Sequence, residues 1–208
     1  MAAARRLIDR DGWEKLTVRK LAAESGVAPT TLYHHIRDKE DLLKQLLDDA
    51  ADGLERPSLP SDPHERIIAA ATAIHTSLSA WPWLAEVLIA DDLTGDAAMW
   101  MVETILGAAV EAGRTPEQAV DVYRAIWYYT AGEILVRASA SRRRAELDGP
   151  TYRDLYILGL DPEAFPHVTS VAEEWPRLAA RDTYEAGLRG LVRGLLGVDP
   201  ERSASSDA

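Results

Sequence analysis

Side chains that could contact nucleic acid gather in one short segment near the N-terminus of this 208-residue chain. Thr30 and Thr31 supply hydroxyl and methyl groups, and Tyr33, His34 and Lys39 supply hydrogen-bond donors. Hydroxyl and methyl groups can contact base edges in the major groove of DNA, whereas donors and cations contact phosphates. The residue types of this segment therefore favour binding to a DNA duplex.

A second set of side chains, in the middle of the chain, could hold a small molecule. Trp100, Glu103 and Thr104 fall within about one helical turn, so a ligand there could meet a ring, a carboxylate and a hydroxyl. Rings with a polar group suit a mostly apolar pocket, whereas the alternative is ordinary core and dimer-interface residues. The predicted ligand-binding residues are His75, Trp100, Glu103, Thr104, Trp127 and Ala131.

Other kinds of chemistry find little support in the sequence. With no cysteine, the chain has no disulfides, thiolate zinc sites, iron–sulfur clusters or cysteine nucleophiles. The five histidines form no His-x-x-x-His pair, and no glycine-rich phosphate loop follows a strand, so we expect no metal, no cofactor and no enzymatic activity. No run of 18 apolar residues exists, and we expect a cytoplasmic protein without a membrane partner.

The charge is divided unevenly along the chain. The formal net charge is -11, yet residues 1–47 carry nine basic and seven acidic side chains. The remaining residues therefore carry the whole acidic excess. A positive end on an acidic body predicts two modules with different partners, although a solvated surface alone could also produce it.

The elements that must position the first set of side chains are short helices. We predict helices over residues 2–10, 18–25, 28–35 and 39–54, with apolar residues at helical spacing. Thr17 and Asp38 can cap two of them, Gly26 can end the second, and Pro29 fits the first turn of the third. Two short helices joined by a tight turn have helix-turn-helix spacing, although a purely structural hairpin would show the same.

A breaker cluster over residues 56–63 marks the main internal boundary, and the helices beyond it are longer. We predict them over 63–80, 82–90, from 94–96 to 112, 116–141 and 181–196, with a mixed segment over 142–180. Arg142, Arg143 and Arg144 follow the long helix, where cations complement its dipole. The predicted fold is all-α, with a helix-turn-helix DNA-binding domain over 1–47, a helical bundle for ligand binding and dimerisation over 48–200, and a disordered tail over 201–208.

The N-terminal segment resembles the DNA-binding head of tetracycline-repressor-type (TetR) regulators over about residues 2–47. The matched positions are Thr17-Val18-Arg19, Leu21-Ala22, Gly26-Val27, Thr31-Leu32-Tyr33, Lys39 and Leu42-Leu43. Two shorter segments, Phe165-Pro166-His167 and residues 182–188, are similar to the closing part of the tetracycline-repressor subgroup. Heads of this family usually begin further upstream, so we expect either a start before Met1 or the loss of contacts from a basic arm.

The resemblance implies a homodimeric transcriptional regulator, usually a repressor, that binds a palindromic operator and whose larger domain binds an effector. The aromatic residues predicted to line the pocket favour a small apolar or aromatic effector. By family position, the residues that face the groove are Pro29, Thr30, Thr31 and Tyr33. Those near phosphates are Thr17, Arg19, Tyr33, His34 and Lys39. For the two-fold interface, helices 116–141 and 181–196 are predicted, the latter with Gly187, Gly190 and Gly194.

Three alternatives remain open at this stage. The first two are a regulator without small-molecule control and a regulator that activates transcription. The third is an all-helical enzyme or small-molecule-binding protein that uses the aromatic cavity, with the N-terminal hairpin serving only a structural purpose. Binding to duplex DNA with a steep salt dependence would separate the regulators from the third alternative, because phosphate neutralisation releases counterions.

Overall fold

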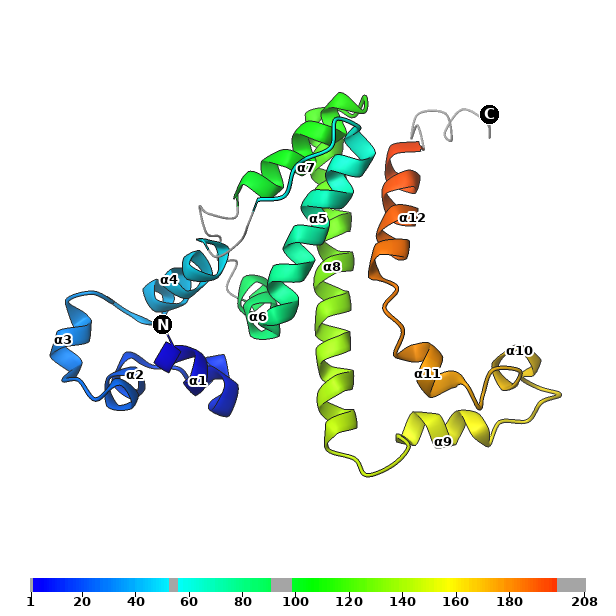
Figure 1. Cartoon of the computed structure of the whole chain (residues 1–208), viewed down its shortest axis with the longest axis horizontal. Coiled ribbons are helices and arrows are strands. Elements are labelled where there is room, and N and C mark those ends of the chain that lie inside the picture. The colour runs from blue at the N-terminus through cyan, green and yellow to red at the C-terminus, as the bar shows by residue number, and fades with distance from the viewer. Residues whose placement is uncertain (1, 53–55, 91–98, 198–208) are drawn as a thin grey trace.

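The structure is a computed structural model that describes residues 2–52, 56–90 and 99–197. The described residues form twelve α-helices and one short 3-10 helix, with no strand among them, which confirms the predicted all-α fold. Figure 1 shows a small helical head, a central bundle and a protruding segment on the side away from the head. None of the helices over the described residues is long and apolar enough to cross a membrane.

The head contains five of these elements, packed around aliphatic side chains. Their bounds are α1 (Ala2–Asp11), η1 (Trp13–Lys15), α2 (Val18–Ser25), α3 (Pro29–Tyr33) and α4 (Lys39–Asp52). Helical spacing places Leu7 of α1, Leu21 of α2 and Leu42 of α4 on inward faces, where each is at most 4% exposed. Burial of these faces therefore holds the hairpin of α2 and α3 against α1 and α4.

Local signals fix the ends of the helices in the head, as the sequence predicts. The Thr17 hydroxyl accepts a hydrogen bond from the backbone N–H of Lys20, and Asp38 caps α4 in the same way. Gly26 adopts a left-handed conformation with φ of 68°, which lets α2 end and the chain turn. The predicted third helix extends two residues too far at its C-terminal end, because the backbone N–H of Arg37 donates to the Asp41 carboxylate at 2.9 Å and not to the Tyr33 carbonyl.

The body is a bundle in which α5, α7 and α8 pack together and α12 lies against α5 and α8 (Figure 1). The bounds are α5 (Pro63–Ala80), α6 (Pro82–Ala90), α7 (Met99–Glu111), α8 (Pro116–Ala145) and α12 (Tyr184–Gly197). Asp62 and Thr115 cap α5 and α8, and Gly113 ends α7 with φ of 93°. The predicted beginning of α7 at residues 94–96, the end of α4 at residue 54 and the tail over 201–208 lie outside the described residues.

Two predicted boundaries in the second half of the chain are wrong. Helix α8 continues to Ala145, so the three arginines occupy its last turn, since arginine is a good helix former and a cation suits a helix C-terminus. Helix α12 begins at Tyr184, later than predicted, and the Asp182 carboxylate accepts a hydrogen bond from the Tyr184 N–H at this start.

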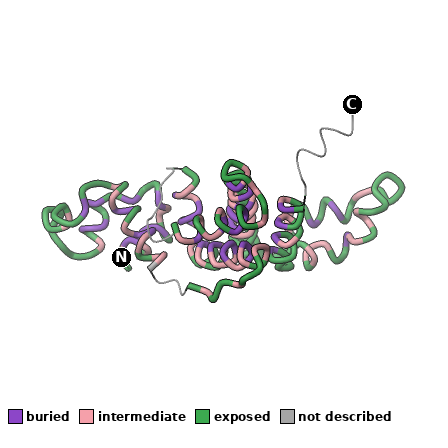
Figure 2. The backbone as a smooth tube through the Cα atoms, turned by 90° about the horizontal axis from the view of Figure 1, so that it is seen from above, coloured by how far each residue is buried: buried purple, intermediate pink, exposed green. Residues whose placement is uncertain are grey.

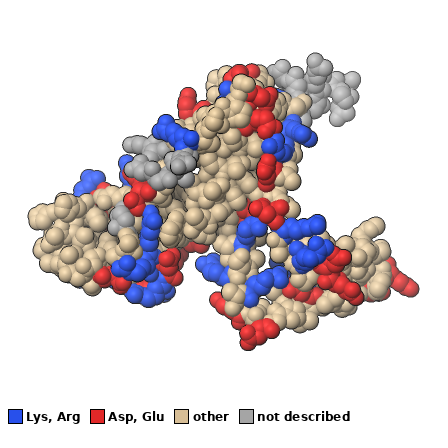
Figure 3. Space-filling view, in the orientation of Figure 1, with Lys and Arg blue, Asp and Glu red and all other residues tan. Residues whose placement is uncertain are grey.

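Residues 146–183, which we call the arm, leave the bundle between α8 and α12 and return to it. The arm contains three short helices, α9 (Tyr152–Leu158), α10 (Pro166–Thr169) and α11 (Trp175–Ala179). Figure 2 shows that most of its backbone is exposed, in contrast to the centre of the bundle. Figure 3 shows arginine side chains gathered where the end of α8 meets the arm.

Candidate functional site

Helix α3 presents the side chains predicted to face the DNA groove. Pro29, Thr30, Thr31 and Tyr33 are all exposed, and no residue of α3 is fully buried. Only Leu32 turns inward, where it packs half-buried against the core of the head. The helix therefore offers almost its entire surface to a partner, and Figure 1 places it at the outer end of the head, away from the bundle.

The residues predicted to lie near phosphates differ in how free their side chains are. Arg19 and His34 are exposed, and the exposed Thr17 uses its hydroxyl to cap α2. Lys39 is half-buried instead: its ammonium donates to the carbonyl of Glu14 at 3.0 Å and lies 4.7 Å from the centre of the Trp13 ring. Lys39 therefore also joins the start of α4 to η1.

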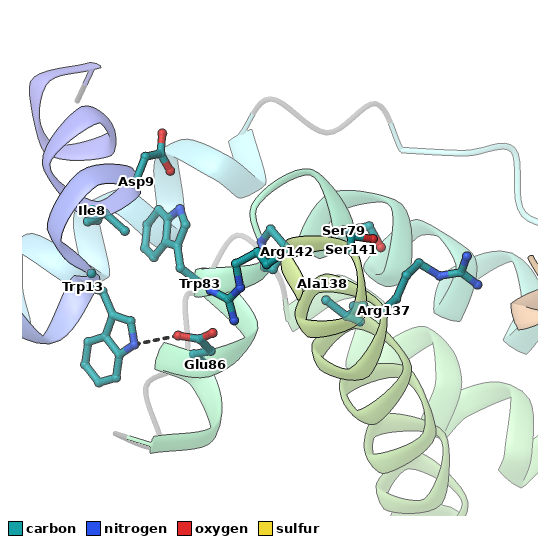
Figure 4. A pocket seen from close by; sticks show the side chains of 13 residues that line it. Ile8, Asp9, Trp13, Ser79, Trp83, Glu86, Arg137, Ala138, Ser141 and Arg142 are labelled. Carbon is teal, nitrogen blue, oxygen red and sulfur yellow. Dashed lines mark hydrogen bonds between the residues drawn. The ribbon is translucent and has the colours of Figure 1, made fainter. Parts of the chain in front are cut away.

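The head meets the body through a small polar and aromatic junction. Trp13, a core residue of the head, donates from its indole Nε1 to a carboxylate oxygen of Glu86 on α6 at 3.1 Å (Figure 4). The Arg5 guanidinium of α1 lies 4.7 Å from the centre of the Trp81 ring and also pairs with Asp49 of α4 at 2.7 Å. A cavity of about 500 Å³ opens beside these contacts, and the sequence pattern did not predict it.

The six residues predicted to bind a ligand lie on α5, α7 and α8, the helices that pack together in the bundle. Trp100 is half-buried with the Arg56 guanidinium over its ring, and Glu103 is exposed. The Thr104 hydroxyl donates to the Trp100 carbonyl of its own helix at 2.7 Å. Trp127 is half-buried against the core and Ala131 is buried.

His75, the remaining residue of that prediction, belongs to a network between α5, α8 and α12. Its Nε2 lies 2.7 Å from a carboxylate oxygen of Glu133, and its ring stacks on Tyr184 with 3.7 Å between the ring centres. Glu133 also pairs with Arg137, so its carboxylate is already held by two neighbours. The structure therefore brings His75 together with Glu133 and Tyr184, which the sequence did not group with it.

Tyr184 occupies the centre of this network and is only 3% exposed. Its hydroxyl donates to the Ala71 carbonyl at 3.1 Å and lies 2.9 Å from the Thr130 hydroxyl. Burial raises the pKa of Tyr184 to about 12, because the phenolate would lose its hydration. Burial also raises the pKa of Tyr129, whose hydroxyl donates to the Tyr184 carbonyl. The hydroxyl groups of Tyr129 and Tyr184 are therefore protonated and uncharged at physiological pH.

A larger cavity of about 810 Å³ lies between the end of α8 and the arm. Tyr152, Tyr156 and Trp175 line it together with Arg143 and Arg144. Its tyrosines are exposed by 81% and 59% in the single chain. No group of three or more His, Asp or Glu side chains within the described ranges is arranged to hold a metal ion.

Both parts of the chain match known protein families. Residues 1–46 match the family model for bacterial regulatory proteins of the tetR family, and residues 56–198 match the tetracyclin repressor-like C-terminal domain. An HTH-type transcriptional regulator of Saccharopolyspora erythraea is 32% identical over 64% of this chain. The HTH-type transcriptional repressor DrrR1 of Streptomyces coeruleorubidus is 30% identical over 73% of it. The matches cover 57% and 58% of the length of these two relatives.

Solved structures of bacterial regulators have the same fold. ActR of Streptomyces coelicolor, crystallised in complex with (S)-DNPA, aligns with a TM-score of 0.71 over 94% of each chain at 22% identity. At this identity the likeness concerns the fold alone. The family matches together span nearly the whole sequence, in the same order as the head and the bundle. The chain belongs to the TetR family of bacterial regulatory proteins.

Proposed function

We propose that this protein is a ligand-responsive transcriptional repressor that binds a palindromic operator as a homodimer and is released by a small ring compound. The observation that carries the DNA-binding part is the exposure of Pro29, Thr30, Thr31 and Tyr33 on a helix held at the outer end of the head. The proposed domains are a DNA-binding head over 1–47 and an effector and dimerisation domain over 48–200. Helix α4 crosses that boundary, so it can transmit movement between them.

Duplex selection followed by binding measurements tests the DNA-binding part. An operator is recovered from a random duplex library, and its affinity is measured by fluorescence anisotropy at several salt concentrations. We expect Thr31→Ala to reduce the preference for the operator over random duplex by about 1–3 kcal/mol, because it removes a base-edge contact. Thr76→Ala, an exposed threonine on α5, is the matched control. Equal affinities for operator and random duplex in the wild type would contradict the proposal.

The proposed dimer is formed by α8 and α12 of each copy, arranged as four helices. Val120, Tyr128 and Val136 follow one another along α8 and are exposed by 45%, 59% and 70% in the single chain. On α12, a Cβ at Gly190 or Gly194 would meet nothing within 4 Å. Exposed apolar groups and small residues on two adjacent helices support close approach of a second copy.

The proposed effector site lies among α5, α7 and α8, with Trp100, Glu103, Thr104, Trp127 and Ala131 around it. His75 is held by Glu133 and Tyr184, so the effector would reach it by competing for an existing contact. The fold supports this proposal, since ActR holds a small molecule on the same fold. The effector acts by binding the released state more tightly than the operator-bound state. On this proposal the protein is a regulator and not an enzyme.

Release of the protein from its operator tests the proposed effector site. The operator complex is titrated with ring compounds, beginning with (S)-DNPA, and release is followed by anisotropy. We expect Trp127→Ala to abolish release by an active compound while operator affinity stays within about twofold, because the ring is distant from the head. If Trp127→Ala and Trp100→Ala both respond like the wild type, the effector site lies elsewhere.

A further inference from the structure

The cavity at the junction of head and body is separate from the proposed effector site. Its walls come from α1 and η1 on the head side and from α5, α6 and the last turns of α8 on the body side (Figure 4). None of the six residues predicted to bind the effector lines it. Its volume of about 500 Å³ falls within the usual range for small-molecule sites.

Trp83 provides a buried hydrogen-bond donor in this cavity without an acceptor. The side chain lines the cavity and is 9% exposed, and its indole Nε1 forms no hydrogen bond to any described group. A buried donor without a partner is rare in folded proteins and costs free energy, so it points to an acceptor that binds there. Ile8, Ile134 and Ala138 add apolar surface around it, which suits the body of a ring compound.

Arg142 provides a second donor group. Figure 4 shows its side chain extending toward Trp83 and Glu86, and it forms no ion pair with any acidic group of the described ranges. The other arginine of the cavity, Arg137, is paired with Glu133 and extends away from Trp83 (Figure 4). A ligand oxygen between Trp83 and Arg142 could therefore accept hydrogen bonds from both.

The acidic groups of the cavity are less available to a ligand. One carboxylate oxygen of Glu86 already accepts the indole N–H of Trp13. Asp9 and Arg142 are both exposed, so solvent and salt screen both charges. The buried group of the cavity without a partner, Trp83 Nε1, is a donor and favours an acceptor atom in the ligand.

We propose that the junction cavity binds a planar ring compound with a carboxylate or another anionic oxygen, its ring against Trp83 and its oxygen accepting from Trp83 Nε1 and Arg142. The ligand touches the head and the body at once, because its walls come from both. Occupancy therefore restrains the head relative to the body, independently of the site among α5, α7 and α8.

Calorimetric titration of the full chain with 2-naphthoate and with neutral 2-naphthamide tests the proposal. We expect 2-naphthoate to bind with a dissociation constant below about 1 mM, and 2-naphthamide to bind at least about tenfold more weakly. Arg142→Gln should weaken 2-naphthoate binding about tenfold or more, and Trp83→Phe, which keeps a ring but removes the N–H, about fivefold. Arg143→Gln is the matched control, since Arg143 is in the same turn of α8 but lines the arm cavity.

Amide hydrogen exchange shows where 2-naphthoate binds on the protein. Bound 2-naphthoate should slow amide exchange in both α1 and α6. No binding at millimolar concentration, wild-type affinity in both Arg142→Gln and Trp83→Phe, or an equal loss in Arg143→Gln would overturn the proposal. Loss of binding in Trp127→Ala with wild-type binding in Arg142→Gln would also overturn it, because the probe would then occupy the proposed effector site.

Discussion

At the scale of single residues, Trp13 joins the DNA-binding head to the body. Lys39 at the start of α4 lies over its ring, and its indole N–H donates to Glu86 of α6. Trp13 thus links Lys39, a side chain expected near a phosphate, to Glu86 in the body of the protein. Movement of α6 can therefore alter the position of α4 without passing along the backbone.

Replacement of Lys39 separates a phosphate contact from a purely structural role. We expect Lys39→Ala to weaken binding to every duplex and to reduce the slope of log affinity against log salt by about one. Lys39→Arg keeps the charge and should retain the slope. The measurement is anisotropy with one duplex between about 50 and 200 mM salt. A lower melting temperature with an unchanged slope would mean that Lys39 only holds η1.

The buried hydroxyl of Tyr184 predicts a loss of stability at high pH. Its pKa is raised from 10.0 to about 12 in the folded protein, so the folded state holds the proton more tightly. The resulting stabilisation is complete below pH 10 and is lost as pH rises toward 12. Urea unfolding at pH 8 and at pH 11 measures the effect. The free energy of unfolding should decrease less between these two pH values for Tyr184→Phe than for the wild type. Tyr152→Phe, at an exposed tyrosine, should behave like the wild type.

At the scale of elements, the packing of α12 on α8 depends on one glycine. A Cβ at Gly187 would clash with the Tyr129 hydroxyl oxygen, which cannot move away without breaking its hydrogen bond to the Tyr184 carbonyl. At the other end of α12, the Arg114 guanidinium donates to the Leu196 carbonyl at 2.6 Å. These two contacts fix α12 against the bundle at both ends.

Substitution of Gly187 tests this packing. We expect Gly187→Ala to lower the free energy of unfolding by about 1–3 kcal/mol, because the added methyl group would clash with the Tyr129 side chain. Gly107→Ala on α7, where a Cβ meets nothing, should be neutral or stabilising by up to about 1 kcal/mol. Tyr129→Phe removes the clashing oxygen and should make Gly187→Ala less costly. Equal stabilities of Gly187→Ala and Gly107→Ala would contradict the packing argument.

At the scale of the whole molecule, the proposed operator geometry requires two heads. Successive major grooves on one face of a duplex are about 34 Å apart, so a dimer must hold the heads at that separation. The exposed Val120, Tyr128 and Val136 of α8 and the open glycines of α12 belong to the body and not to the head. Assembly and DNA binding are therefore assigned to different parts of the chain.

A bulky side chain on α12 tests the dimer. We expect Gly190→Leu to turn the dimer into a monomer in sedimentation at micromolar protein, since close approach of two copies has no room for it. Helical content by circular dichroism should remain unchanged, because a Cβ at Gly190 meets nothing within its own chain. Gly107→Leu should remain dimeric. A wild-type protein that sediments as a monomer would contradict the proposed interface.

Features that depend on residues close together in the chain could be predicted from the sequence. The cap at Thr17, the left-handed turn at Gly26 and the capping box at Thr115 follow from local chemistry, and the structure has all three. The all-α fold follows from helical spacing of apolar residues, and the family from fixed spacings in the head. Two helix ends differ from the prediction, because the carboxylates of Asp41 and Asp182 accept hydrogen bonds from backbone N–H groups there, and helical periodicity does not indicate such contacts.

Contacts between side chains far apart in the sequence are seen in the tertiary structure alone. Trp13 and Glu86 are separated by 73 positions, and His75 and Glu133 by 58. A helical pattern states which face is apolar but not which residue of another helix it will touch, since that depends on packing of the whole bundle. The junction cavity, the buried N–H of Trp83 and the stack of His75 on Tyr184 arise in this way. They exist because helices remote in sequence pack side by side, which no local spacing encodes.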